Sequence, residues 1–302
     1  MTRWQKGFFI VLLTSIMWAL SGNMGSYLFK HSDMTPQVLT SFRLLGGGLC
    51  LLGLCLYEGL DIFSIWKIKR NIYFLFLYGI GGLFIMQYGF FACVNYANAP
   101  TACLLQYCGV FFVIFYASVV MKIPPRKVTK IALPVTVVGV ILLLTKGDLD
   151  SLNISMPTLI TGLLAMLGYT ISNLAPISLT SHYPPKIVAA WAMCIGGVAM
   201  TLVNILGQTG LPDLQGFSYF ALFYCVVFGT ALPFAMYLSG QKVVGPTVAS
   251  LLGLSESLFS AIISLVWLKE IFTVTDLLGM VCVLFGVILM SLPEKKPGLV
   301  KK

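Results

Sequence analysis

Long apolar runs alternate with short polar stretches along the whole chain. Cutting the sequence at charge clusters, prolines and polar turns leaves ten apolar segments, each of about 20 residues, the length that a helix needs to cross a hydrocarbon layer of about 30 Å. The segments are 7–29, 36–57, 71–95, 99–121, 128–145, 157–180, 187–207, 217–240, 247–268 and 273–292. This pattern predicts an all-α integral membrane protein with ten transmembrane helices.

The composition agrees with membrane segments and excludes other classes of protein. Hydrophobic residues make up 58% of the chain, charged residues only 10%, and the mean hydropathy is +0.94, whereas soluble domains carry about 25% charged residues. The net charge of +9 is spread singly or in small groups between the apolar runs, so it does not indicate nucleic-acid binding. The first apolar stretch is too long for a signal-peptide core, and we expect it to be retained as a helix.

The basic residues predict the orientation, because Lys and Arg near helix ends stay on the cytoplasmic side. With the N-terminus inside, 15 of the 19 basic residues are cytoplasmic, three (Lys30, Lys146 and Lys269) are outside, and one, Arg43, falls within a span. This bias predicts that both termini are cytoplasmic, which requires an even number of helices.

A weak internal repeat divides the ten segments into two sets of five. Pro100-Thr101 is followed 39 residues later by the sequence GVIL at 139–142, and Pro246-Thr247 is followed 40 residues later by GVIL at 286–289. The second and seventh segments open at Pro36 and Pro185. Because five is odd, the second copy would enter the membrane from the opposite side, as in inverted-repeat transporters. We expect one repeat at 1–146, a second at 155–292 and a cytoplasmic basic tail at 293–302, although short apolar matches also arise from composition alone.

Two ionisable residues, Arg43 and Glu256, lie deep within predicted spans, where charge is costly and marks a pathway or a partner. From the predicted span ends, Arg43 is about 10 Å and Glu256 roughly 16 Å below the outer boundary. One interpretation is a structural ion pair that ties the two halves together. The other is a substrate site, in which Arg43 holds a carboxylate and Glu256 faces an amine or carries an exchangeable proton.

Neutral polar and aromatic residues within the spans are weaker candidates, since each is also typical of contacts between helices. The candidate substrate-binding set is Arg43, Glu256, Trp18, Asn23, Gln106, Tyr107, Tyr88, Tyr169, Asn173 and Trp191. Further polar or aromatic candidates are Ser21, Phe42, Gln87, Asn95 and Ser172. Glycine runs at 46–48, 79–82 and 196–197 suit either static close packing or sliding of helices. All eight cysteines fall within spans without a CxxC motif, so no metal or cofactor is expected.

Several stretches resemble the EamA-type transporters of the drug/metabolite transporter superfamily over essentially the whole chain. They are SIMWALSG at 15–22, SFR at 41–43, ANAPT at 97–101, LSESLF at 254–259, WLKE at 267–270 and residues 279–289. The resemblance implies a ten-helix carrier of the bacterial inner membrane that moves amino acids, other metabolites or drugs, mostly outward. Two positions depart from the family pattern: Lys122-Ile123 replaces the Lys-Glu pair in the first copy, and Ser257 stands where a proline is common.

These features favour a secondary active transporter that exports amino acids or related small metabolites by alternating access. No GxxxxGK[ST] motif is present, so ATP does not drive transport directly, and Glu256 is the candidate for proton coupling. The expected partners are a small amphiphilic or zwitterionic substrate and the lipid bilayer.

Three alternatives are weighed against this hypothesis. Proton-coupled efflux of drugs or toxic compounds is disfavoured because the first span lacks the acidic residue that the small multidrug exporters of the superfamily use there. An intramembrane enzyme would need clustered His, Asp, Glu or Cys, and a channel would need a filter sequence or a ring of subunits.

Overall fold

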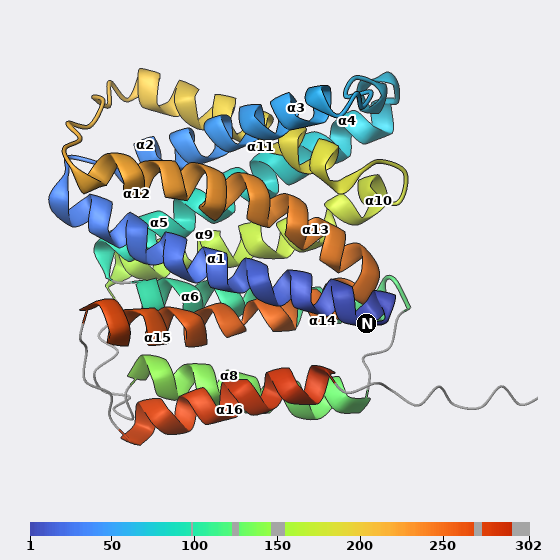
Figure 1. Cartoon of the computed structure of the whole chain (residues 1–302), viewed down its shortest axis with the longest axis vertical. Helices are drawn as coiled ribbons and strands as arrows, with labels where there is room; N and C mark the ends of the chain where they lie inside the picture. The colour runs from blue at the N-terminus through green and yellow to red at the C-terminus, as the bar shows by residue number, and fades with distance from the viewer. Residues whose placement is uncertain (98, 123–126, 146–154, 269–273, 292–302) are drawn as a thin grey trace, which may run out of the picture.

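The computed structural model describes residues 1–97, 99–122, 127–145, 155–268 and 274–291. Within these ranges the chain is helical and contains no β-strand, as predicted. The helices lie side by side with roughly parallel axes (Figure 1). The predicted basic tail 293–302 and the predicted outside residues Lys146 and Lys269 lie outside the described ranges.

Six helical stretches are long and apolar enough to cross a membrane, which supports a multi-pass membrane protein. They coincide with six predicted segments, and their ends differ from the predicted ends by at most four residues. Their bounds are Arg3–His31, Pro36–Tyr57, Lys69–Tyr96, Met156–Thr180, Pro185–Leu206 and Phe217–Val244.

Four of these stretches are built from more than one element. The elements of the six are α1 (Arg3–His31); α2 (Pro36–Ser41), η1 (Phe42–Gly46) and α3 (Gly47–Tyr57); α4 (Lys69–Phe76), η3 (Leu77–Phe84) and α5 (Ile85–Tyr96); α9 (Met156–Leu174) and α10 (Pro176–Thr180); α11 (Pro185–Leu206); and α12 (Phe217–Val226), η5 (Val227–Ala231) and α13 (Leu232–Val244). The elements η1, η3 and η5 are π-helical, and a short 3₁₀ turn, η2 (Ser64–Lys67), precedes α4.

The other four predicted segments correspond to shorter or interrupted helices. They are α6 (Ala99–Tyr107) with α7 (Gly109–Val119), α8 (Lys127–Thr145), α14 (Pro246–Gly253) with α15 (Ser255–Leu268), and α16 (Val274–Ser291). Helices α8 and α16 pack against each other at one side of the bundle (Figure 1). The total of ten membrane crossings stays a prediction.

Local chemistry explains where several helices begin. Thr35 accepts a hydrogen bond from the Val38 backbone N–H at 3.3 Å, and Pro36 occupies the first turn of α2. Ser155 caps α9 in the same way through the Thr158 N–H. A hydroxyl that accepts from a free N–H of the first turn stabilises a helix start, and proline there sacrifices no hydrogen bond.

Two helices break at positions that the repeat relates to each other. The interruption falls at Cys108, eight residues after Pro100, and at Leu254, eight residues after Pro246. At the second break the Leu254 N–H bonds to the Leu251 carbonyl, three residues back, which tightens the turn. The backbone N–H groups of Phe111 and Ser257, three residues after each break, bond to the carbonyls of Cys108 and Leu254.

The helices that open at Pro36 and Pro185 run in opposite directions. At one end Lys186, at the start of α11, forms a salt bridge with Glu58, just after α3. At the other end Asn204, near the end of α11, donates to the carbonyl of Gln37, at the start of α2, at 3.3 Å. This antiparallel relation between repeat-related helices is the one that an inverted repeat requires.

Glycines allow the closest helix contacts, and the predicted glycine runs take part in them. A Cβ atom on Gly197 would lie 2.5 Å from the Leu45 backbone nitrogen, and one on Gly196 would lie 2.5 Å from the Gly79 carbonyl oxygen. Another close approach joins α9 to α5, where a Cβ on Gly168 would lie 2.3 Å from the Met86 nitrogen. These contacts join the two predicted repeats, and they involve backbone atoms that cannot move aside cheaply.

We expect Gly168→Ala to destabilise the protein by about 1–3 kcal/mol, because the added methyl group forces α9 away from α5. The matched control is Gly53→Ala, since a Cβ on exposed Gly53 of α3 meets no atom within 4 Å. Thermal unfolding in detergent, followed by tryptophan fluorescence, measures both variants. Equal unfolding temperatures for Gly168→Ala and the wild type would contradict the packing described.

Candidate functional site

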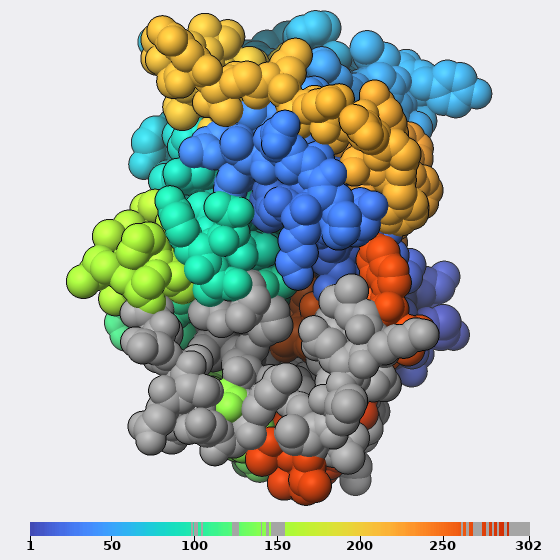
Figure 2. Space-filling view, turned by 90° about the vertical axis from the view of Figure 1, so that its left-hand side faces the viewer, coloured from blue at the N-terminus to red at the C-terminus, as the bar shows by residue number. Residues whose placement is uncertain are grey.

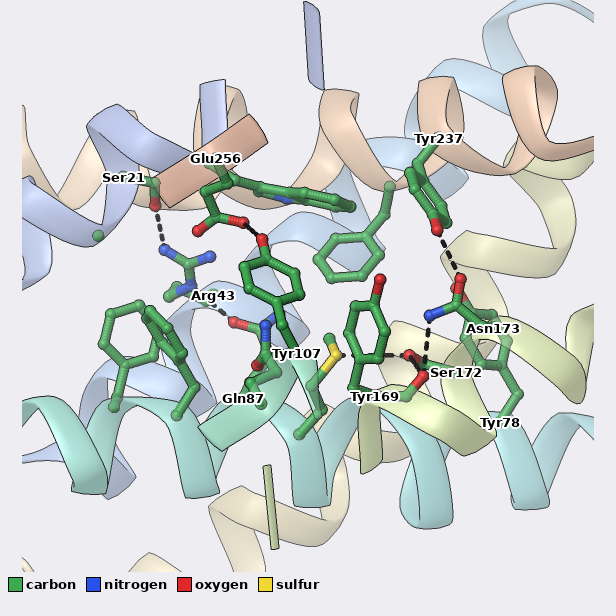
Figure 3. A pocket seen from close by; sticks show the side chains of 17 residues that line it. Ser21, Arg43, Tyr78, Gln87, Tyr107, Tyr169, Ser172, Asn173, Tyr237 and Glu256 are labelled. Carbon is green, nitrogen blue, oxygen red and sulfur yellow. Dashed lines mark hydrogen bonds between the residues drawn. The ribbon is translucent and has the colours of Figure 1, made fainter. Parts of the chain in front are cut away.

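Helices from both predicted repeats enclose a cavity in the middle of the bundle (Figure 3). It is lined by residues of α1, η1, η3, α5, α6, α9, α13 and α15, namely Trp18, Ser21, Gly22, Arg43, Tyr78, Met86, Gln87, Phe90, Phe91, Gln106, Tyr107, Tyr169, Ser172, Asn173, Phe234, Tyr237 and Glu256. Its open space is about 60 Å³. One water needs about 10–15 Å³, so the cavity in this conformation has room for a few waters.

Arg43 lies in the π-helical turn η1 and is only 4% exposed. Its guanidinium donates from Nε to Gln87 Oε1 at 2.8 Å, from Nη1 to Ser21 Oγ, and from Nη2 to the Gly229 carbonyl at 2.9 Å. Its centre lies 4.6 Å from the centroid of the Phe91 ring. Neutral groups from three other helices therefore hold the cation, as a buried charge requires.

Gly229 makes part of this arrangement possible. It belongs to the π-helical turn η5, and such a turn disturbs the regular backbone hydrogen bonding of a helix. A Cβ atom at this position would lie 2.2 Å from Ser21 Oγ and 3.3 Å from Arg43 Nη1. The position therefore requires glycine, because a side chain would push Ser21 away from the guanidinium.

Glu256 lies in the first turn of α15, directly after the break at Leu254, and is 6% exposed. Glu256 Oε2 accepts a hydrogen bond from the Tyr107 hydroxyl, and Tyr107 is the last residue of α6, directly before the other break. The two repeat-related interruptions therefore bring one acceptor and one donor together.

No salt bridge joins Arg43 to Glu256, two residues that the structure describes. Of the two interpretations, the structural ion pair therefore does not form here: each charge is satisfied by neutral neighbours, although both side chains line the same cavity. Figure 3 shows Arg43 and the Glu256–Tyr107 pair toward one end of the cavity. The cavity consequently carries a cation and an anion that do not neutralise each other by direct contact.

Gln87 leaves a buried donor without a partner beside Arg43. Its Oε1 accepts from Arg43 Nε, which fixes the orientation of the amide, and its Nε2 has no hydrogen-bond partner although Gln87 is 3% exposed. An unpaired buried N–H group costs about 1–3 kcal/mol. A buried amide donor that lines a cavity is therefore poised to bind an acceptor there.

Tyrosine and amide groups dominate the other end of the cavity (Figure 3). The Tyr237 hydroxyl donates to Asn173 Oδ1 at 2.5 Å, and the Tyr169 hydroxyl donates to the Ser250 carbonyl at 3.1 Å. Trp18 packs against Tyr237 with ring centroids 5.2 Å apart, and Tyr107 meets Tyr169 edge to face at 5.5 Å. Aromatic walls of this kind suit a solute with an apolar part.

Seven of the ten predicted site residues line the cavity: Trp18, Arg43, Gln106, Tyr107, Tyr169, Asn173 and Glu256. So do the further candidates Ser21, Gln87 and Ser172.

The other three predicted site residues, Asn23, Tyr88 and Trp191, are not among the lining residues. Asn23 donates to the Ala19 carbonyl and to Ser260 Oγ. Trp191 donates from Nε1 to the Ile62 carbonyl at 2.7 Å and packs against Trp66 at one end of the bundle. Tyr88 is half-buried and follows Gln87 on α5, so it projects about 100° away from it.

Two of the further candidates lie outside the cavity. Phe42 is 38% exposed, and Asn95 is also exposed. Neither lines the cavity.

Five aromatic lining residues escaped the sequence interpretation: Tyr78, Phe90, Phe91, Phe234 and Tyr237. Inside an apolar run an aromatic residue is typical of any buried or lipid-facing position, so residue type alone does not single them out. Spacing offers one usable signal. Phe90 and Phe91 follow Gln87 by three and four residues, which places all three on one helix face.

Comparison with known proteins agrees with the helical membrane fold. The sequence matches the model of the EamA-like transporter family over residues 5–145 and 156–292. It is 32% identical over 293 residues to the uncharacterized inner membrane transporter YicL of Salmonella typhimurium, covering 97% of both chains. It is 36% identical over 109 residues to the uncharacterized transporter YdfC of Bacillus subtilis, covering 36% of this chain and 35% of that one.

A solved protein structure superposes with a TM-score of 0.78 at 15% identity, over 95% of this chain and 96% of the other. That similarity shows the fold alone. Because the family model matches nearly the whole chain in two successive copies, this multi-pass membrane protein belongs to the EamA-like transporter family.

Proposed function

We propose that the protein is a secondary active transporter that exports amino acids or related small zwitterionic metabolites, with the central cavity as its substrate site. The observation that carries this proposal is the pair of buried, opposite charges, Arg43 and Glu256, which line one cavity without a direct salt bridge. A zwitterion offers one group to each charge. Burying such a solute beside complementary charges offsets the cost of taking it out of water.

The surroundings of Arg43 support a carboxylate at that end of the cavity. The guanidinium supplies the positive charge, and Gln87 Nε2 supplies a buried donor that lacks an acceptor. A carboxylate accepts hydrogen bonds and donates none, so it satisfies this site. The substrate ammonium would then lie toward Glu256, and the aromatic rings of Trp18, Phe90 and Phe234 would contact its apolar side chain.

Alternating access explains why the cavity is small. Because the cavity in this conformation has room for a few waters, we expect its walls to move apart when a larger solute enters. The walls come from both predicted repeats, and rocking of one repeat against the other would open them. The Tyr107–Glu256 hydrogen bond joins the two repeats across the cavity. Substrate binding would break this hydrogen bond and replace it with a contact between Glu256 and the substrate.

Proton-coupled efflux of cationic drugs is the second candidate, and the aromatic walls favour it. The buried guanidinium of Arg43 argues against it, because a cationic drug would enter a cavity that already holds a positive charge. The two candidate functions predict opposite effects of a substrate carboxylate on binding affinity. An amino-acid carrier needs the carboxylate and a carrier of cationic drugs does not, so one experiment separates them.

We expect Arg43→Ala and Gln87→Met to weaken binding of an amino acid but to leave binding of its decarboxylated amine within about two-fold. For Arg43→Ala the loss for the amino acid should be about 10- to 100-fold, the value of a hydrogen bond to a charged group. A thermal-shift screen of the twenty common amino acids identifies the best probe. Its affinity, and that of its amine, is then measured by isothermal titration.

Arg70→Ala is the matched control, because Arg70 is an exposed residue of α4 and should leave both affinities unchanged. Gln87→Met keeps the volume of the side chain and removes the unpaired donor, so it tests the site if Arg43→Ala proves unstable. Tighter binding of the amine than of the amino acid by the wild-type protein would favour the drug-efflux alternative.

We expect Glu256→Gln to abolish the stimulation of net export by a pH gradient while exchange of labelled for unlabelled substrate continues. Glu256 is the carboxyl that lines the cavity, and glutamine keeps its size but carries no exchangeable carboxyl proton. Proteoliposome flux with and without an imposed pH gradient makes the measurement, with exposed Asp33→Asn as the control. Undiminished stimulation in Glu256→Gln would rule out proton coupling through this residue.

A further inference from the structure

A second cavity, distinct from the central one, lies between the helix that starts at Pro36 and the helix that starts at Pro185. Its volume is about 520 Å³. The lining residues are Val38, Ser41, Phe42, Leu45, Gly46, Leu49, Thr201, Asn204, Ile205, Thr209 and Leu211. We call this cavity the lateral groove. None of its lining residues belongs to the central cavity.

The lateral groove opens on a surface with large exposed apolar side chains. Leu49 is 56% exposed, Ile205 is 66% exposed and Leu211 is 83% exposed. In a chain whose helices cross a membrane, such a surface faces lipid. Figure 2 views the end of the bundle at which α1 joins α2 (blue) beneath the stretch that joins α11 to α12 (yellow to orange).

One polar atom in the groove lacks a partner. Asn204 Nδ2 donates to the Gln37 carbonyl at 3.3 Å, which fixes the orientation of the amide. Asn204 Oδ1 is buried and has no hydrogen-bond partner, and the residue as a whole is only 9% exposed. A buried acceptor of this kind is costly to leave unpaired, and its location in the groove marks the place where a ligand donor would bind.

The dimensions of the groove match one leaflet of a bilayer. Asn204 lies two residues before the end of α11, which is about 3 Å along the helix axis. This position is near the membrane surface. From Val38 to Leu49 the groove follows the helix for roughly 16 Å, at 1.5 Å per residue, which is about half of a hydrocarbon layer of about 30 Å. The acceptor thus lies at headgroup depth and the apolar part at acyl-chain depth.

We propose that the lateral groove binds a bilayer phospholipid, with an acyl chain along Leu45 and Leu49 and an N–H or O–H donor of the headgroup bonded to Asn204 Oδ1. The ligand class follows from the groove itself: an apolar channel of leaflet depth with one acceptor at its outer end. Choline headgroups have no such donor, whereas ethanolamine and glycerol headgroups do. The proposal rests on the membrane fold and not on the identity of the transported substrate.

The bound lipid would lie against both predicted repeats. One wall of the groove is α2, η1 and α3, and the other is α11 with the residues that follow it. These helices also contact each other through Ser41 Oγ and Thr201 Oγ1, which are 2.7 Å apart. A lipid in this position would change the energy of moving one repeat against the other, so lipid composition would affect stability and transport together.

The test titrates delipidated, detergent-solubilised protein with four dioleoyl phospholipids, and native mass spectrometry counts bound lipid. The four are phosphatidylethanolamine, its N-methyl and N,N-dimethyl derivatives, and phosphatidylcholine, which carry three, two, one and no N–H groups. We expect the first three to bind with similar affinity and phosphatidylcholine to bind about ten-fold more weakly, the value of one charge-assisted hydrogen bond.

Two variants locate the site. Asn204→Leu should bind all four lipids equally, whereas Asn204→Asp, which keeps an acceptor oxygen, should retain the discrimination. The control Asn95→Leu, at an exposed asparagine of α5, should behave as the wild type. Equal binding of phosphatidylethanolamine and phosphatidylcholine by the wild type, or discrimination that survives in Asn204→Leu, would overturn the proposal. In that case water, and not a headgroup, satisfies Asn204.

Discussion

The cost of placing charge inside an apolar bundle governs the central part of this structure. An isolated guanidinium or carboxylate in such an interior costs several kcal/mol, so each must be satisfied where it lies. Arg43 is held by Ser21, Gln87 and the Gly229 carbonyl, and Glu256 accepts a hydrogen bond from Tyr107. Because neutral groups hold each charge, both remain available to a solute that carries the opposite charges.

The repeat supplies the scaffold for these charges, and divergence between its copies supplies the charges themselves. Pro246 follows Pro100 by 146 residues, so Glu256 corresponds to position 110, which is Val110. Pro185 follows Pro36 by 149 residues, so Arg43 corresponds to position 192, which is Ala192. Each half thus contributes one charge, and the other half has an apolar residue at the related place. This asymmetrical interior within a repeated frame supports the proposed zwitterionic solute, because the two ends of a zwitterion differ.

Periodicity and charge were sufficient to predict the helical membrane fold and most helix ends, because span length is fixed by bilayer thickness. They also selected Arg43 and Glu256, since a charge inside an apolar run stands out. The sequence could not assign Tyr237 to the cavity, because in sequence it resembles a lipid-facing tyrosine. Nor could it exclude Trp191 from the cavity, because the contact of Trp191 with Ile62 depends on the path of a loop. The sequence left a direct ion pair open as one of two interpretations, because depth along the membrane normal does not show which neighbours lie closer. The π-helical turns, which position Arg43 and Gly229, left no pattern that was recognised.

The central claim is that the cavity between the two repeats receives a zwitterion between Arg43 and Glu256. An experimental structure determined with the amino acid that gives the largest thermal shift tests it most directly. The predicted density has its carboxylate within hydrogen-bond distance of Arg43 and Gln87 Nε2, and its ammonium toward Glu256. Density for the amino acid outside this cavity, or a direct Arg43–Glu256 salt bridge in the bound state, would contradict it.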